Sequence, residues 1–183
     1  MKLFALISVV TAFVIFLAYN IALWIQFKIP SSLSESFYLY DKKRKNLGYI
    51  FTGMMFLTAF LLLPGWIEVS EASDICGVTL TFLAFFTCAA ICFVGAAPAF
   101  RASEIESKVH SISAKVCAVA ALLWDFIVCW KIMYVPIATM LLVLLVAWLT
   151  KTLKSGMIYW LEMCAFFGTF FTIAAQLGVW LIG

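Results

Sequence analysis

Long apolar runs separated by short polar stretches dominate the chain. Each run approaches the roughly 20 residues that an α-helix needs to cross the hydrocarbon core of a bilayer. Because lipid offers the backbone no hydrogen-bond partner, such runs must form helices or closed barrels, and they lack the alternating pattern of barrel strands. The predicted spans are residues 3–27, 47–69, 75–100, 109–130, 132–149 and 157–182. The pattern therefore predicts an all-α polytopic membrane protein, a bundle of six transmembrane helices.

Composition agrees with this class of protein. Of the 183 residues, 66% are hydrophobic and 11% are charged, and the mean hydropathy is +1.13. Such values are typical of polytopic membrane proteins. No linker rich in Pro or Ser divides the chain, so residues 1–183 are predicted to form a single transmembrane domain. Membrane lipids are the expected partners, nucleic acid is not, and a homo-oligomer or a membrane protein partner stays open.

Charge is unevenly divided between the loops. Most cations fall in loops 28–46, 101–108 and 150–156, whereas the opposite side holds an acidic turn with few cations. The positive-inside rule then places these three loops in the cytoplasm and both termini outside, in the cytoplasmic (plasma) membrane. The first apolar run has no convincing cleavage site and is interpreted as an uncleaved span.

The first loop carries its own pattern. Pro30 ends the first span, a run of serines offers helix-capping side chains, and Phe37 to Tyr40 supplies aromatic surface suited to the membrane–water boundary. We expect a short interfacial helix that ends at the basic block 41–45. The loop either anchors the chain at anionic headgroups or folds over a pocket and presents Ser34 and Glu35 to a ligand.

The six cysteines lie almost entirely within apolar runs and form no C-x-x-C pair. They are interpreted as small packing residues, since small side chains let helices approach closely in lipid. A redox or metal role for Cys88 and Cys92 is the disfavoured alternative. A disulfide between Cys76 and Cys129 stays open.

Charged side chains at membrane depth are costly, so each needs a partner. Lys115 and Glu162 are predicted at similar depth and favour a structural ion pair across adjacent helices. Alternatively, Glu162 lies near His110 and forms a proton-sensitive site, because imidazole titrates near neutral pH. For Asp125 the favoured partner is Gln176, and the alternative is a cation or proton site in the outer leaflet.

His110 is the only histidine. One imidazole cannot supply the multi-histidine metal sites of membrane desaturases or the paired axial ligands of b-type cytochromes. The chain also lacks a G-x-S-x-G, G-x-G-x-x-G or Walker sequence. No metal or cofactor is therefore predicted, and a non-enzymatic role is favoured.

One junction resembles a known group of proteins. Gly95 to Phe100, the polar loop to Lys108, and His110 with Ala114 are similar to the third-to-fourth-span junction of the DUF998 and Frag1/DRAM/Sfk1-type six-helix membrane proteins. Pro30 followed by Leu33-Ser34-Glu35 also resembles the pattern after their first span, although Ser36-Phe37 replaces the usual Leu-Gly. The resemblance implies a six-span fold and a link to lipid handling rather than a settled reaction.

Three functional hypotheses follow. In the first, the protein binds or organises lipid without catalysis, and a polar cluster contacts headgroups. The predicted members of this cluster are Ser34, Glu35, Arg101, Lys108, His110 and Lys115. The second is a small transporter or channel whose path uses Asp125 and Glu162. The third is a membrane-embedded hydrolase with His110 as general base.

Overall fold

The computed structural model describes residues 1–73, 80–96 and 104–182, with backbone alone for 104–111, and these residues are almost entirely helical. The helices are α1 (Lys2–Phe27), α2 (Glu35–Lys43), α3 (Tyr49–Ala72), α4 (Thr81–Ala96), α5 (Glu104–Ile127), α6 (Tyr134–Leu149) and α7 (Met157–Ile182), with the short 3-10 helix η2 (Trp130–Ile132) before α6. No strand occurs in these ranges, which confirms the predicted all-α class.

Among the described residues, three helices are long and apolar enough to cross a membrane: α1, α3 and α7. Helices α4 and α6 have 16 residues each. At about 1.5 Å per residue they reach about 24 Å, which is less than the roughly 30 Å of a hydrocarbon core. The structure therefore fits a membrane-embedded helical protein, with fewer full-length spanning helices than the six that the sequence pattern predicts.

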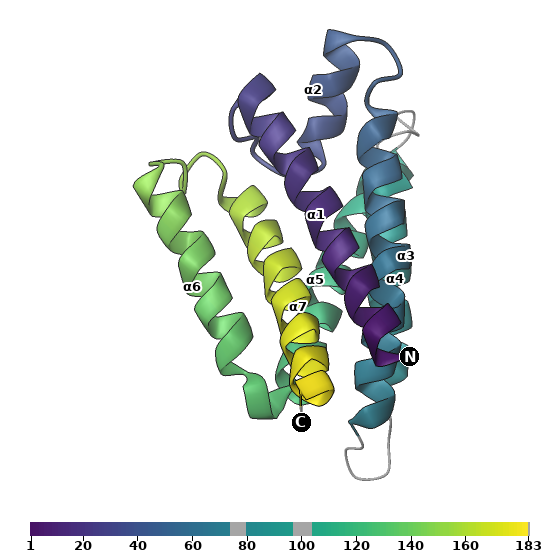
Figure 1. Cartoon of the computed structure of the whole chain (residues 1–183). Coiled ribbons are helices and arrows are strands. Elements are labelled where there is room, and N and C mark those ends of the chain that lie inside the picture. Colours follow the sequence, from purple (N-terminus) through teal and green to yellow (C-terminus); the bar gives the residue numbers. More distant parts are fainter. Residues whose placement is uncertain (74–79, 97–103, 183) are drawn as a thin grey trace.

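The bundle is built around α1, α3 and α7. Helices α1, α3, α4 and α5 pack as successive neighbours, and α7 contacts α1, α3, α5 and α6. Figure 1 shows α6 at the edge of the bundle, beside α7. Accordingly, only Pro136, Val143 and Ala147 of α6 are buried, and its large apolar side chains face outward.

The short helix α2 confirms that the first loop contains a helix, and this helix ends within the basic block. Its place at a membrane–water boundary stays a prediction. It lies at the same end of the bundle as the turn between α6 and α7, and both chain termini lie toward the opposite end (Figure 1). The predicted common side of loops 28–46 and 150–156 is therefore observed. Loop 101–108 begins outside the described residues.

Helices α3 and α4 approach each other closely where one of them carries a small residue. A Cβ atom on Gly95 of α4 would lie 2.6 Å from the Cβ of Met55 on α3, and the Thr52 hydroxyl donates to the Gly95 carbonyl at 2.8 Å. The Cys88 thiol donates to the Ala59 carbonyl at 3.3 Å. The five described cysteines are free, in line with the packing interpretation, whereas Cys76 lies outside the described residues.

Candidate functional site

The first loop is fastened to the start of α7 by hydrogen bonds. The backbone N–H of Leu33 donates to Glu162 Oε2 at 2.6 Å, and the N–H of Tyr159 donates to the Ser31 carbonyl at 3.1 Å. Gly156 leaves little space here, since a Cβ atom on it would lie 3.0 Å from the Pro30 carbonyl oxygen. The loop and α7 thus form one junction at this end of the bundle.

A buried polar network continues from this junction into α1. The Tyr159 hydroxyl accepts the indole N–H of Trp24 at 2.7 Å and donates to Asn20 Oδ1 at 2.7 Å. The Asn20 amide in turn donates to the Phe16 carbonyl at 2.8 Å. Every polar atom of the Tyr159 and Asn20 side chains has a partner, so this network stabilises the bundle and leaves little capacity for a ligand.

Two predicted ligand-contacting residues are held inside the loop. The Glu35 carboxylate accepts the N–H of Ser31 at 2.6 Å and its hydroxyl at 2.7 Å. Ser34 is buried, and its hydroxyl lies 3.2 Å from that of Ser32. The structure thus shows both residues ordering the turn before α2, and their predicted contact with a ligand stays a prediction.

The predicted ion pair between Lys115 and Glu162 requires correction. Lys115 is exposed on α5, and no ion pair joins it to Glu162, although both side chains are described. The carboxylate is partnered by the backbone of the docked loop instead. This contact joins residues 129 positions apart, and no charge pattern in the sequence signals it.

Three of the predicted headgroup contacts, Arg101, Lys108 and His110, fall outside the part of the chain whose side chains are described. Arg101 lies outside the described residues, and so do the side chains of Lys108 and His110, which belong to the first turns of α5. A contact between His110 and Glu162 or a serine therefore stays a prediction.

Asp125 is completely buried near the end of α5. Its Oδ2 accepts the hydroxyl of Thr169 at 3.2 Å, and its Oδ1 has no hydrogen-bond partner. The predicted bond to Gln176 is corrected, because Thr169 on α7 takes that place. Gln176 instead lines a cavity of about 210 Å³ with Ser73, Cys129 and Lys131.

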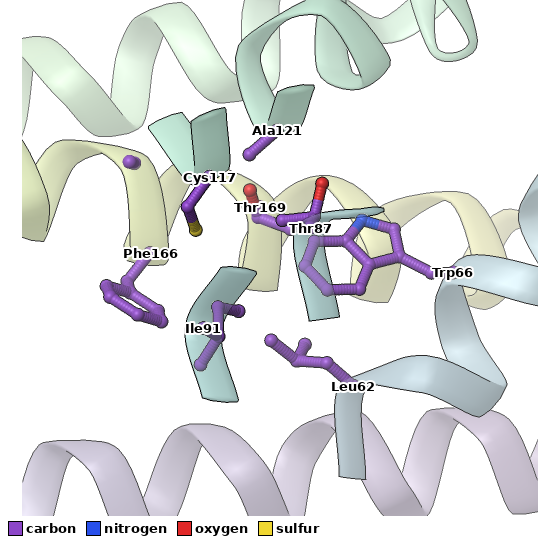
Figure 2. A pocket seen from close by; sticks show the side chains of 9 residues that line it. Leu62, Trp66, Thr87, Ile91, Cys117, Ala121, Phe166 and Thr169 are labelled. Atoms are coloured by element: carbon purple, nitrogen blue, oxygen red, sulfur yellow. The ribbon is translucent and has the colours of Figure 1, made fainter. Parts of the chain in front are cut away.

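A second, smaller cavity has a volume of about 20 Å³. It is lined by side chains of α3, α4, α5 and α7, among them Ala121, one turn before Asp125. In Figure 2 the indole of Trp66, the thiol of Cys117 and the hydroxyl of Thr169 are seen around it. The Trp66 indole N–H is buried without a partner. Such a volume is large enough for about one water molecule.

An apolar groove of about 570 Å³ lies between α1 and α3, capped by α2 and the segment after it. On α1 its wall recurs at helical spacing through Ile15, Tyr19, Ala22 and Gln26. The full wall adds Tyr40, Leu47, Ile50, Gly53, Met54 and Leu57. The spacing on α1 is visible in the sequence, but every face of this helix is apolar, so the pattern does not single out the groove.

One end of the groove is polar and basic. Lys43 Nζ donates to Gln26 Oε1 at 2.7 Å and lies 5.8 Å from the centre of the Phe27 ring. Burial raises the pKa of the Tyr40 hydroxyl, so this group stays neutral beside the groove. The rest of the wall is apolar. The arrangement can therefore hold a molecule with an apolar body and an anionic end.

Comparisons of the chain with family models, curated proteins and solved structures found no match. The likeness to the DUF998-type junction therefore stays an expectation.

Proposed function

We propose that the protein is a non-enzymatic, lipid-binding membrane protein and that the groove between α1 and α3 receives an acyl chain of an anionic lipid. The supporting observation is the groove itself, apolar along its length and basic at the end where α2 caps it. The proposal places the lipid site on α1 and α3, at a distance along the chain from the predicted cluster around His110.

The length of the groove supports a lipid of one leaflet. From Ile15 to Gln26 the wall covers eleven residue steps of α1. At about 1.5 Å per step this corresponds to roughly 16 Å, or about half of a hydrocarbon core of about 30 Å. An acyl chain in the groove would run from the headgroup region to the middle of the bilayer.

Charge complementarity supports an anionic headgroup. Lys42, Lys43, Arg44 and Lys45 follow one another at the end of α2, and all four are exposed. Each cation near an anionic surface contributes about 1 kcal/mol of attraction. The positive-inside rule assigns this end to the cytoplasmic leaflet of a plasma membrane.

The proposal retains six membrane segments. Helices α4 and α6 would cross a locally thinned bilayer. The exposed apolar side chains of Leu141 and Leu142, which are 64% and 60% accessible, support contact of α6 with lipid tails.

Filling the groove tests the proposal. Gly53 lines the groove, and a Cβ atom on it would have no neighbour within 4 Å, so Gly53→Leu adds an apolar side chain to the groove wall with free space at its Cβ. Purified protein is mixed with phosphatidylglycerol, and bound lipid is counted by native mass spectrometry. We expect Gly53→Leu to reduce binding about tenfold, since competing occupation costs at least 1.4 kcal/mol.

Gly178 provides the matched control, because it also has free space at its Cβ position but lies on α7, away from the groove. Gly178→Leu is expected to bind lipid as the wild type does. The double substitution Lys42→Gln and Lys43→Gln should weaken phosphatidylglycerol binding by roughly tenfold and leave phosphatidylcholine binding unchanged. Equal binding by wild type and Gly53→Leu would refute the groove as the lipid site.

A further inference from the structure

The interface between α5 and α7 is lined by small and polar side chains at helical spacing. On α5 these are Ala114, Cys117, Ala118, Ala121 and Asp125, and on α7 they are Glu162, Ala165, Thr169 and Gln176. Thr172 falls between the last two at the same helical spacing. Positions three or four apart share one face of a helix. Each helix therefore presents a continuous stripe of this kind along most of its length.

Three cavities follow one another along this interface. The first, about 40 Å³, includes Glu162 in its wall, and it shares Cys117, Ala165 and Phe166 with the second, the 20 Å³ cavity of Figure 2. The third is the 210 Å³ cavity beside Gln176. Each is large enough for at least one water molecule.

Asp125 lies between the second and third cavities. Ala121, one turn before it, lines the second cavity, and Cys129, one turn after it, lines the third. Its bonded partner Thr169 is also part of the second cavity wall. Along α5, Asp125 thus lies between residues that line the second cavity and residues that line the third.

Polar atoms without partners mark the same region. Asp125 Oδ1 and the Trp66 indole nitrogen are both buried, with side-chain exposure of 0% and 1%, and neither has a hydrogen-bond partner. Buried polar groups in proteins are almost always paired by protein or by ordered water. Trp66 lines the second cavity, and Asp125 lies one helical turn from residues that line the second and the third, so each has a water-sized space close by.

We propose that the α5–α7 interface is a proton pathway and that Asp125 is its relay. A hydronium ion on the Glu162 side gives a proton to the Asp125 carboxylate, which becomes a carboxylic acid, and a neutral water is left behind. The acid then gives the proton to a water on the Gln176 side, which becomes a hydronium ion, and the carboxylate is restored. One proton crosses, and no bond other than O–H forms or breaks.

The chemistry of the site favours a proton over a metal cation. Within the described residues, no three His, Cys, Asp or Glu side chains come together as a metal would need. The second cavity also has room for only about one water, too little for a hydrated ion. The other titratable groups on the elements packed against α5 are Tyr49, Glu68 and Glu71 of α3, Cys88 and Cys92 of α4, Lys131 of η2, and Tyr159, Glu162 and Cys164 of α7.

The test measures proton flux into proteoliposomes of phosphatidylcholine and phosphatidylglycerol that contain a pH-sensitive dye. A potassium gradient with valinomycin supplies the driving force. We expect wild-type vesicles to acidify faster than protein-free vesicles, and Asp125→Asn to reduce the flux to the protein-free rate. Thr169→Val, which removes the hydroxyl donor to Asp125, is expected to change the flux about fivefold.

Glu71→Gln, which removes an exposed carboxylate, is the control for loss of a charge. Gly53→Leu, which fills the groove, separates the proton pathway from lipid binding. Both variants should carry protons at the wild-type rate. If Asp125→Asn does not fold, the infrared spectrum of the wild type decides: a pH jump should change a carboxylic acid band, and Thr169→Val should shift it. Wild-type flux at the protein-free rate, undiminished flux in folded Asp125→Asn, or an absent or unshifted band would overturn the proposal.

Discussion

Helix α7 has two faces that differ in how they meet their neighbours. Toward α1 it presents aromatic rings: Phe16 lies 4.5 Å from Phe166 and 5.6 Å from Phe170, measured between ring centroids, and Phe13 lies 5.8 Å from Phe170. Toward α5 it presents small side chains, cavities and hydroxyl groups. The first face is densely packed, and the second leaves space.

The difference shows how one membrane helix can both stabilise a bundle and leave room for chemistry. In lipid, helices associate through dispersion contacts and interhelical hydrogen bonds rather than through the exclusion of water. The aromatic face and the Tyr159 network supply these contacts. The α5 face is then free to contain the unpaired atoms and voids that a tightly packed interface would exclude.

The largest expected effect tests the aromatic face. Phe16→Ala removes a completely buried ring that contacts three rings of α7. We expect the free energy of unfolding to fall by roughly 2–4 kcal/mol, because the ring leaves a cavity in a dense interface. The measurement is unfolding by SDS in mild detergent micelles, and Phe4→Ala, 66% exposed on the same helix, should change it little. Equal losses for the two variants would contradict the comparison.

A medium effect is expected in the polar network. Tyr159→Phe removes one hydroxyl and leaves the Trp24 indole N–H and Asn20 Oδ1 without their partner. The expected loss is about 1–2 kcal/mol in the same unfolding measurement, since membrane hydrogen bonds contribute modestly. Tyr134→Phe, on an exposed tyrosine, is the control. An unchanged Tyr159→Phe would show that the network is not structural.

The smallest effect is expected on the α5 face. Thr172→Val replaces a buried hydroxyl that has no partner by a methyl group of similar size. Unfolding free energy should stay within about 1 kcal/mol of wild type or rise, because no hydrogen bond is lost. A loss above about 2 kcal/mol would mean that this face is as structural as the aromatic one.

Local sequence patterns predicted the helices well. Apolar runs place α1, α3 and α7 within a few residues of their observed ends, and the serines and aromatic residues after Pro30 predict α2. These features depend on neighbours along the chain. The run 132–149 yields only 16 helical residues, because η2 and the turn around Met133 precede α6. Hydropathy alone does not register such a turn.

The site could be predicted only in part. Asp125 and Glu162 stand out as carboxylates in apolar runs, but their partners come from elsewhere in the fold: a threonine 44 positions away and a backbone N–H 129 positions away. The sequence analysis paired residues by their expected depth in the membrane, which favoured Gln176 for Asp125 and Lys115 for Glu162. Depth does not tell which face of a helix contacts which neighbouring helix. The groove depends on three separate segments and has no linear signature.

The distance along the chain between Asn20 and Tyr159 has a consequence for synthesis in the cell. Their hydrogen bond joins residues 139 positions apart. At about 5–20 residues per second, a ribosome needs roughly 7–28 s to make the intervening segment. During that interval, Asn20 Oδ1 and the indole N–H of Trp24 on the newly inserted α1 lack their hydrogen-bond partner Tyr159. The insertion machinery or interfacial water must supply hydrogen bonds to these groups until α7 is inserted.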